Sequence, residues 1–303
     1  ITVISALLLT TGCDLFIKTN KGQVDQKWYM GLTYEDDNGN DTDYTIGTDG
    51  TIAAVALEDG YGDEFGIIKG EEAYLNINTI IKNIDKRFYV DATNNLVMFT
   101  DATKTYKTKI GGKTINETEN TDYVISFMDG KNCYVNVKFV KKYVDFDYKV
   151  KAEGKSPARI VLKYTSGEKN QMTVKSNIEM RTKADYQNLI VTTLKKNTKV
   201  TVLEESGDWT KVGTDDGFMG YVPAKKLKDK ETKKTEFKSD ADTYTHVLMN
   251  KKISLGWNAI TNLTANGNLE TIIEHTKGLN VISPTWYSLS DNKGNLRSYA
   301  SAT

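Results

Sequence analysis

The residue types best suited to catalysis and metal binding are sparse in this sequence. The two histidines, His246 and His275, have no neighbouring pattern that would complete a Ser-His-Asp triad or a histidine zinc site. The two cysteines, Cys13 and Cys133, leave no disulfide framework and no cysteine-based zinc site. Cys133 lies in the alternating segment NCYVNVKFV, which predicts a buried thiol. No glycine-rich phosphate loop opens a helix, so we expect no bound nucleotide. Together with the sparse histidines and cysteines, this predicts no catalytic residue, no metal and no other cofactor in this chain.

One acidic stretch superficially suggests a calcium loop, DDNGNDTDY at residues 36–44. It lacks the alternating ligand positions, the glycine at the sixth position and the glutamate at the twelfth that an EF-hand uses. We therefore expect a hydrated turn there. Forty basic and forty acidic residues leave the chain without net charge, so the composition gives no electrostatic case for nucleic-acid binding.

The first thirteen residues, ITVISALLLTTGC, form an apolar run like the hydrophobic part of a secretory signal. Three interpretations are open: a lipoprotein signal with lipid on Cys13, an uncleaved membrane anchor, or an ordinary buried segment. The pair Gly12-Cys13 suits the first, while the run is shorter than the roughly 18–20 residues of a membrane span. We expect export with membrane attachment, followed by a polar tether up to residue 30.

The sequence between residues 31 and 170 contains an internal repeat with an offset of sixty residues. YLNINTIIKNIDKRFYV starts at Tyr74 and YVNVKFVKKYVDFDYKV starts at Tyr134. Each copy predicts a short strand, a short helix and a further strand, at 96–100 or at 159–165, which indicates a duplicated α+β unit. Identical pairs at this offset include Tyr74/Tyr134, Asn76/Asn136, Lys82/Lys142 and Asp85/Asp145.

The duplicated unit resembles the copper amine oxidase N-terminal-like domain of bacterial wall proteins, over residues 31–170. This resemblance implies a small α+β module. It implies no copper site in this chain, because the segment contains no histidine. A role as a spacer or as a wall contact is what we expect of it.

Residues 176–228 contain motifs typical of a small barrel of short strands. Apolar residues alternate within them, as expected for strands with one buried face. Gly217 and Gly220 are placed where a positive φ or close packing is required. The segment resembles a bacterial SH3 domain, and we place that domain at residues 171–228. The motifs are MRT (180–182), KKNTKVTVLEE (195–205), DWTKV (208–212) and DGFMGYVPAKKL (216–227).

This resemblance implies a binding function. Relatives hold stem or cross-bridge peptides of peptidoglycan in a groove lined by aromatic side chains and a few polar groups. For Trp209 and Tyr221, the alternative interpretation is that they form the core of the barrel. The residues that match such a groove are Asp185, Tyr186, Trp209, Phe218 and Tyr221.

The C-terminal segment predicts a strand, a helix and a second strand, after a charged linker at 229–247. The strand is expected at 251–260, the helix at 265–278 and the second strand at 279–295. This order is the opening unit of a parallel α/β structure, and one such unit cannot cover a parallel sheet on both faces. We therefore expect this segment to expose apolar surface when isolated.

LGW at 255–257 and NVISPTWYSL at 280–289 carry a further resemblance. From residue 246 on, the segment resembles the start of a family 18 glycoside hydrolase domain, which implies an incomplete (β/α)8 TIM barrel. The family's catalytic D-x-x-D-x-E motif does not occur in this sequence, and DGYGDEF at 59–65 has its letters at the wrong spacing. Barrel packing is the alternative for the aromatic residues at the strand ends. The sugar-binding residues that the resemblance implies are Trp257, Asn258, Trp286 and Tyr287.

These patterns predict a multidomain chain whose partners are peptidoglycan or another cell-wall polymer, with the membrane contacted through the N-terminus and with no nucleic acid or nucleotide bound. Two functions are open. The chain is either the non-catalytic front of an exported wall glycosidase acting on an N-acetylglucosamine-containing polymer, or a non-catalytic wall-binding or sensory protein with a degenerate barrel. The expected domains are a signal or anchor with tether at 1–30, the α+β module at 31–170, the SH3 domain at 171–228, the linker at 229–247 and the start of the TIM barrel at 248–303.

Overall fold

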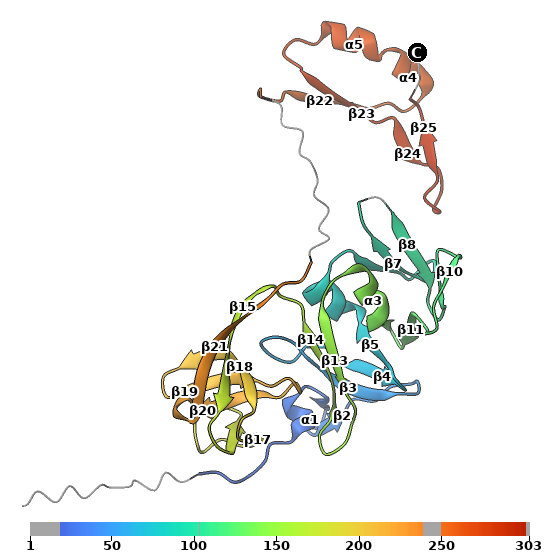
Figure 1. The fold of residues 1–303 in the computed structure, drawn as a ribbon. Helices are drawn as coiled ribbons and strands as arrows, with labels where there is room; N and C mark the ends of the chain where they lie inside the picture. The colour runs from blue at the N-terminus through green and yellow to red at the C-terminus, as the bar shows by residue number, and fades with distance from the viewer. Residues whose placement is uncertain (1–18, 103, 239–249, 301–303) are drawn as a thin grey trace, which may run out of the picture. The chain divides into compact units, whose positions relative to one another are not determined.

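The computed structural model describes residues 19–102, 104–238 and 250–300. The chain divides into two units, Ile1–Asp242 and Thr243–Thr303, which we describe separately (Figure 1). The expected signal or anchor with Cys13, and His246 in the expected linker, lie outside the described residues. No helix within the described ranges has the length and apolar character needed to cross a membrane. The described structure is mostly β.

The first unit begins with a seven-stranded sheet in the order β11-β12-β5-β4-β3-β14-β13. β14 pairs with β3 in parallel, and the other neighbours are antiparallel. A three-stranded sheet of β6, β7 and β8, together with the helix α3, adds Phe88, Phe99 and Phe139 to the hydrophobic core of this module. The bounds are β3 Thr51–Ala56, β4 Gly66–Lys69, β5 Glu72–Asn76, β6 Phe88–Asp91, β7 Leu96–Thr100, β8 Thr105–Lys109, β11 Ser126–Asp129, β12 Asn132–Asn136, α3 Val137–Tyr143, β13 Asp147–Lys151 and β14 Ala158–Lys163.

The predicted duplication is confirmed in its strand and helix. β5 and β12 are antiparallel neighbours. Their register pairs Tyr74 with Asn136 and Tyr134 with Asn76, so the tyrosine of each copy lies opposite the asparagine of the other. Asn76 and Asn136 each end a strand and accept a backbone N–H of the first turn of the following helix. After the helix the copies differ, because the first continues into the three-stranded sheet and the second returns to the main sheet as β13 and β14. The helix of the first copy consists of α2 (Ile77–Thr79) and η1 (Ile80–Ile84).

Two local predictions for this module are also confirmed. Cys133 is buried, and its burial raises the pKa of the thiol to about 11, so the thiol is protonated at neutral pH. The acidic stretch forms a turn between β1 (Thr33–Glu35) and β2 (Asp41–Asp43). The Asp36 carboxylate accepts two backbone N–H groups of that turn, one of them from Asn40. Hydrogen bonds to the ionised form lower the pKa of Asp36.

The second sheet of this unit has seven strands in the order β17-β16-β20-β19-β18-β15-β21. Its buried side chains are mostly valines and leucines, which form a separate small core. We refer to this sheet and its loops as the barrel (Figure 1). The bounds are β15 Gly167–Val174, β16 Ile178–Arg181, β17 Ile190–Leu194, β18 Lys199–Ser206, β19 Trp209–Gly213, β20 Met219–Pro223, η2 Ala224–Lys226 and β21 Leu227–Thr235.

The barrel extends beyond both of its expected boundaries. β15 begins at Gly167 instead of residue 171, and it pairs with β21 up to Thr235. The expected linker at 229–247 is therefore wrong in its first seven residues, since 229–235 are strand. This charged sequence suits the position of β21 at the end of the sheet, because lysine on an edge strand opposes pairing with other chains.

The expected polar tether at 14–30 is also wrong for its described part. Val24 and Met30 are buried, and residues 26–29 form the short helix α1 (Gln26–Tyr29). Asp25 caps this helix by accepting the backbone N–H of Lys27 at 2.8 Å. Polar residues surround Val24 from Asn20 to Lys27, and this composition concealed the buried side chains.

The α+β module and the barrel form one compact unit because the turn before β20 packs against the main sheet of the module. The Tyr61 hydroxyl donates to the Gly217 carbonyl at 2.9 Å. The Arg159 side chain donates to the Asp216 carbonyl at 2.7 Å and stacks on the Phe218 ring at 4.3 Å. Gly217 has a φ of +81°, and an added Cβ there would lie 2.8 Å from Val161 Cγ2.

The second unit confirms the expected strand–helix–strand order and its parallel pairing. β22 (Leu255–Asn258) pairs in parallel with β23 (Val281–Pro284). The single helix expected at 265–278 is wrong: two short helices meet at Asn268, which ends the first and precedes the second. A hairpin follows. The remaining elements are α4 (Leu263–Gly267), α5 (Leu269–His275), β24 (Tyr287–Leu289) and β25 (Leu296–Ser298).

The contact at Gly217 generates a stability prediction. Gly207 also has a positive φ, +58°, but an added Cβ there would meet nothing within 4 Å. Gly207→Ala should lower the free energy of unfolding by about 1–2 kcal/mol through backbone strain alone. Gly217→Ala should lower it by roughly a further 1–3 kcal/mol, because the methyl group would overpack against Val161. Denaturant unfolding monitored by circular dichroism measures both, and equal losses would show that this contact is not tightly packed.

Candidate functional site

An aromatic pair of the barrel lies outside its hydrophobic core. Tyr186 is in the loop between β16 and β17, and Trp209 is the first residue of β19. Their rings meet edge to face with centroids 4.8 Å apart. Both side chains are half-buried, whereas Val212 and Val222 belong to the buried core. Trp209 is therefore not a core residue, and the pair presents aromatic surface to solvent.

The strand register places further side chains on the face that carries Trp209. Trp209 is opposite Pro223, and Lys211 is opposite Tyr221. Directly opposite residues share a face of the sheet, and neighbours along a strand alternate between faces. Trp209, Lys211 and Tyr221 therefore lie on one face. Thr210, which is buried, points into the core.

The α+β module covers the other end of this face. Met219 packs with Ala56 and Val161 of the module. The Lys211 ammonium donates to the Asp59 carbonyl at 3.0 Å. The uncovered end is where the aromatic side chains gather. We refer to Tyr186, Trp209 and Tyr221 as the aromatic site.

Two of the expected groove residues have other positions. Phe218 lies in the contact between the barrel and the module, under Arg159, because it follows the covered turn at Gly217. Asp185 is exposed beside Tyr186, and its carboxylate accepts the Gln187 backbone N–H at 2.9 Å. Asp185 thus stabilises the loop that carries Tyr186. The structure brings Tyr186 and Trp209 into contact, places Tyr221 on the face that carries Trp209, and separates Phe218 from them.

Arg181 was missed by the sequence reasoning, although it lies next to the aromatic site. It is opposite Tyr221 in the register, only 1% exposed, and its guanidinium lies 5.9 Å from the Tyr186 ring. A buried cation requires charged or carbonyl partners. Glu179 pairs with it from the same face of β16, and the spacing of two residues within a strand was the signal available in the sequence.

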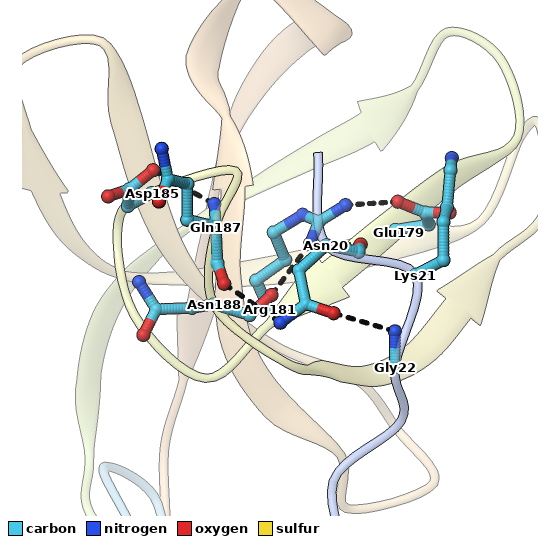
Figure 2. Close-up of polar contacts among 8 residues, drawn as sticks. All are labelled: Asn20, Lys21, Gly22, Glu179, Arg181, Asp185, Gln187 and Asn188. Atoms are coloured by element: carbon cyan, nitrogen blue, oxygen red, sulfur yellow. Dashed lines mark hydrogen bonds and ion pairs between the residues drawn. The ribbon is translucent and has the colours of Figure 1, made fainter. Parts of the chain in front are cut away.

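A segment far away in the sequence completes this region. Residues 20–25, which we call the N-terminal arm, lie along β17 and reach the loop at 185–188 (Figure 2). Figure 2 shows the Arg181 guanidinium between the arm and this loop, donating to the carbonyls of Asn20 and Asn188 at 2.9 and 2.6 Å. Arg181 and the arm thereby both hold the loop.

The expected sugar-binding residues lie in the second unit. Trp257 and Asn258 end β22, while Trp286 and Tyr287 follow β23. Trp257 is 79% exposed, whereas Trp286 is half-buried and its indole N–H donates to Asn266 Oδ1 at 2.6 Å. Since consecutive residues of a strand alternate, Trp257 and Asn258 lie on opposite faces of the sheet. A sugar-binding role for these residues stays a prediction.

Within the described ranges, no group of three or more histidine, cysteine, aspartate or glutamate side chains has an arrangement suited to a metal ion. The exposed Asp185 carboxylate lies next to the aromatic site in the loop of Tyr186, and Lys211 lies opposite Tyr221. Such a set can bind a ligand by stacking and hydrogen bonding.

Comparison with known proteins identifies the domain that carries this site. Residues 176–228 match the family model described as the bacterial SH3 domain, which includes β16 to β20 and therefore all three residues of the aromatic site. Neither the curated proteins nor the solved structures give a match to the chain. Residues 176–228 are a bacterial SH3 domain.

Proposed function

We propose that the aromatic site binds the peptide portion of peptidoglycan. Bacterial SH3 domains commonly bind cell-wall polymers, peptidoglycan among them. The observation that carries the proposal is the edge-to-face contact of Tyr186 and Trp209, two half-exposed rings that the core does not require. Rings of this kind offer a large contact area at low conformational-entropy cost. Asp185 adds an exposed carboxylate that can accept hydrogen bonds from amine or amide groups of the peptide.

In this proposal the α+β module is a rigid spacer. Its resemblance to the copper amine oxidase N-terminal-like domain fits a role as a wall-protein module without chemistry of its own. The contact around Gly217 fixes the barrel relative to the module and keeps the aromatic site at the uncovered end. A ligand that reaches the site thus meets a preformed surface, which reduces the cost of binding.

Replacing Trp209 tests the binding proposal. Trp209→Ala should weaken binding of the full chain to purified peptidoglycan by about 2 kcal/mol, roughly thirtyfold, as expected for a central aromatic contact. The matched control is Trp28→Ala, since Trp28 is 56% exposed on α1 and outside the aromatic site. Both variants should retain the circular dichroism of the parent. Equal binding by the Trp209 variant and the parent in a sedimentation assay would place the ligand elsewhere.

We also propose that the protein is exported and held at the membrane through its N-terminus. The apolar run at 1–13 and the Gly12-Cys13 pair support this proposal. If Cys13 carries the lipid, Cys13→Ser should move the protein from the detergent-soluble membrane fraction to the aqueous fraction after expression in a bacterial host. An unchanged membrane fraction would favour an uncleaved anchor, and an aqueous parent protein would exclude both forms of attachment.

A second candidate function concerns the second unit. We propose that it is the opening of a family 18-like glycosidase barrel acting on an N-acetylglucosamine-containing polymer. The parallel pairing of β22 with β23 across a helical connection supports this proposal. Leu289 and Trp257, which are 70% and 79% exposed, mark apolar surface that further barrel elements would cover.

The source DNA beyond codon 303 tests the glycosidase proposal. An open reading frame with a D-x-x-D-x-E motif on a later strand is the expected result. The 303-residue chain itself should show no hydrolysis of N-acetylglucosamine polymers, because the motif does not occur in it. A stop codon at that point would instead support the alternative, a non-catalytic wall-binding or sensory protein with a degenerate barrel.

A further inference from the structure

The N-terminal arm covers an edge strand of the bacterial SH3 domain. β17 is the last strand on its side of the sheet, so one row of its backbone groups has no strand partner from the domain itself. The arm supplies one: the Val24 N–H donates to the Ile190 carbonyl and the Ile190 N–H donates to the Gly22 carbonyl, both at 2.9 Å. Gln23 bridges Ile190 in parallel orientation. The arm therefore binds as an added strand, in the manner of an extended peptide on a sheet edge.

Asn20 connects this strand to the loop that carries Tyr186. Its backbone N–H donates to the Tyr186 carbonyl at 2.9 Å. Its side-chain amide donates to the Gln187 carbonyl at 3.0 Å, and its side-chain oxygen accepts the Gly22 N–H at 2.8 Å. Two consecutive carbonyls of the loop are thus held by one residue of the arm, and Figure 2 shows the contact with Gln187.

Arg181 couples the position of the arm to the position of the loop. Its guanidinium donates to the carbonyl of Asn20 on the arm and to the carbonyl of Asn188 on the loop, and it pairs with Glu179. If the arm detached, the buried guanidinium would lose one of these acceptors. Because a buried hydrogen-bond donor without an acceptor is costly, the loop would have to move or admit water.

We propose that the arm is part of the aromatic site, with Asn20 and Arg181 as positioning residues that hold Tyr186 against Trp209. This inference rests on the proposed binding function for its effect on affinity. Its structural part does not depend on any ligand. Displacement of Asn20 would therefore release the loop that carries Tyr186.

Asn20→Ala is the test, with Lys21→Ala as the matched control. Lys21 is the next residue of the arm and its side chain is 75% exposed. Among the described residues, its ammonium pairs with the Glu179 carboxylate at 3.4 Å. In the full chain labelled with 15N-tryptophan, Asn20→Ala should shift the Trp209 indole signal, assigned by its loss in Trp209→Phe, and leave the other three indoles unchanged. It should also accelerate hydrogen exchange at the Ile190 amide. Lys21→Ala should do neither.

The affinity for purified peptidoglycan supplies a second readout. Loss of the hydrogen bond from the Asn20 side chain to the loop in Asn20→Ala should weaken binding about fivefold, with an unchanged circular dichroism spectrum. An unshifted Trp209 indole with unchanged exchange at Ile190, or equal changes in Lys21→Ala, would overturn the inference. A shifted indole in a chain that binds no peptidoglycan would support the inference while contradicting the proposed ligand.

Discussion

The packing of the turn at Gly217 against the main sheet of the α+β module decides what the bacterial SH3 domain can present to a partner. A side chain at Gly217 would collide with Val161, so the two surfaces approach at backbone distance. Arg159 stacks on the neighbouring Phe218 ring and donates to the Asp216 carbonyl. These contacts bury one end of the face that carries Met219 and leave the other end, with Trp209, free. The position of the candidate site is therefore a consequence of a contact that lies outside it.

The two edges of the SH3 sheet are covered or protected in different ways. At one end, β21 follows β15 through Thr235 and carries four lysines, Asp229 and Glu231, which keep a long edge strand from pairing with other chains. At the other end, the N-terminal arm pairs with β17. The arm brings Asn20 to the loop beside Trp209, so protection of an edge and organisation of the aromatic site result from the same hydrogen bonds.

Local patterns in the sequence were reliable where a short segment has one structural solution. The offset repeat identified two strand–helix units, because an asparagine at the strand end caps the following helix in both copies. The alternating residues around Cys133 predicted a buried thiol. The prediction of a single helix in the second unit is wrong at Asn268. The helical periodicity continues there in the sequence, but the backbone starts a new helix. The predictions of a tether and a linker are wrong because composition was the only guide. Buried apolar side chains hold the expected tether, and strand pairing holds the first part of the expected linker.

The sequence by itself determined the bacterial SH3 domain, since its strand and turn motifs lie within 53 consecutive residues, 176–228. It also determined Tyr186 and Trp209 as candidates, because their residue types are recognisable without coordinates. Only the tertiary structure placed Phe218 in an internal contact, buried Arg181 and brought Asn20 to the loop. These outcomes depend on pairings between residues more than 150 positions apart, such as Arg181 with Asn20, and no local spacing contains that information.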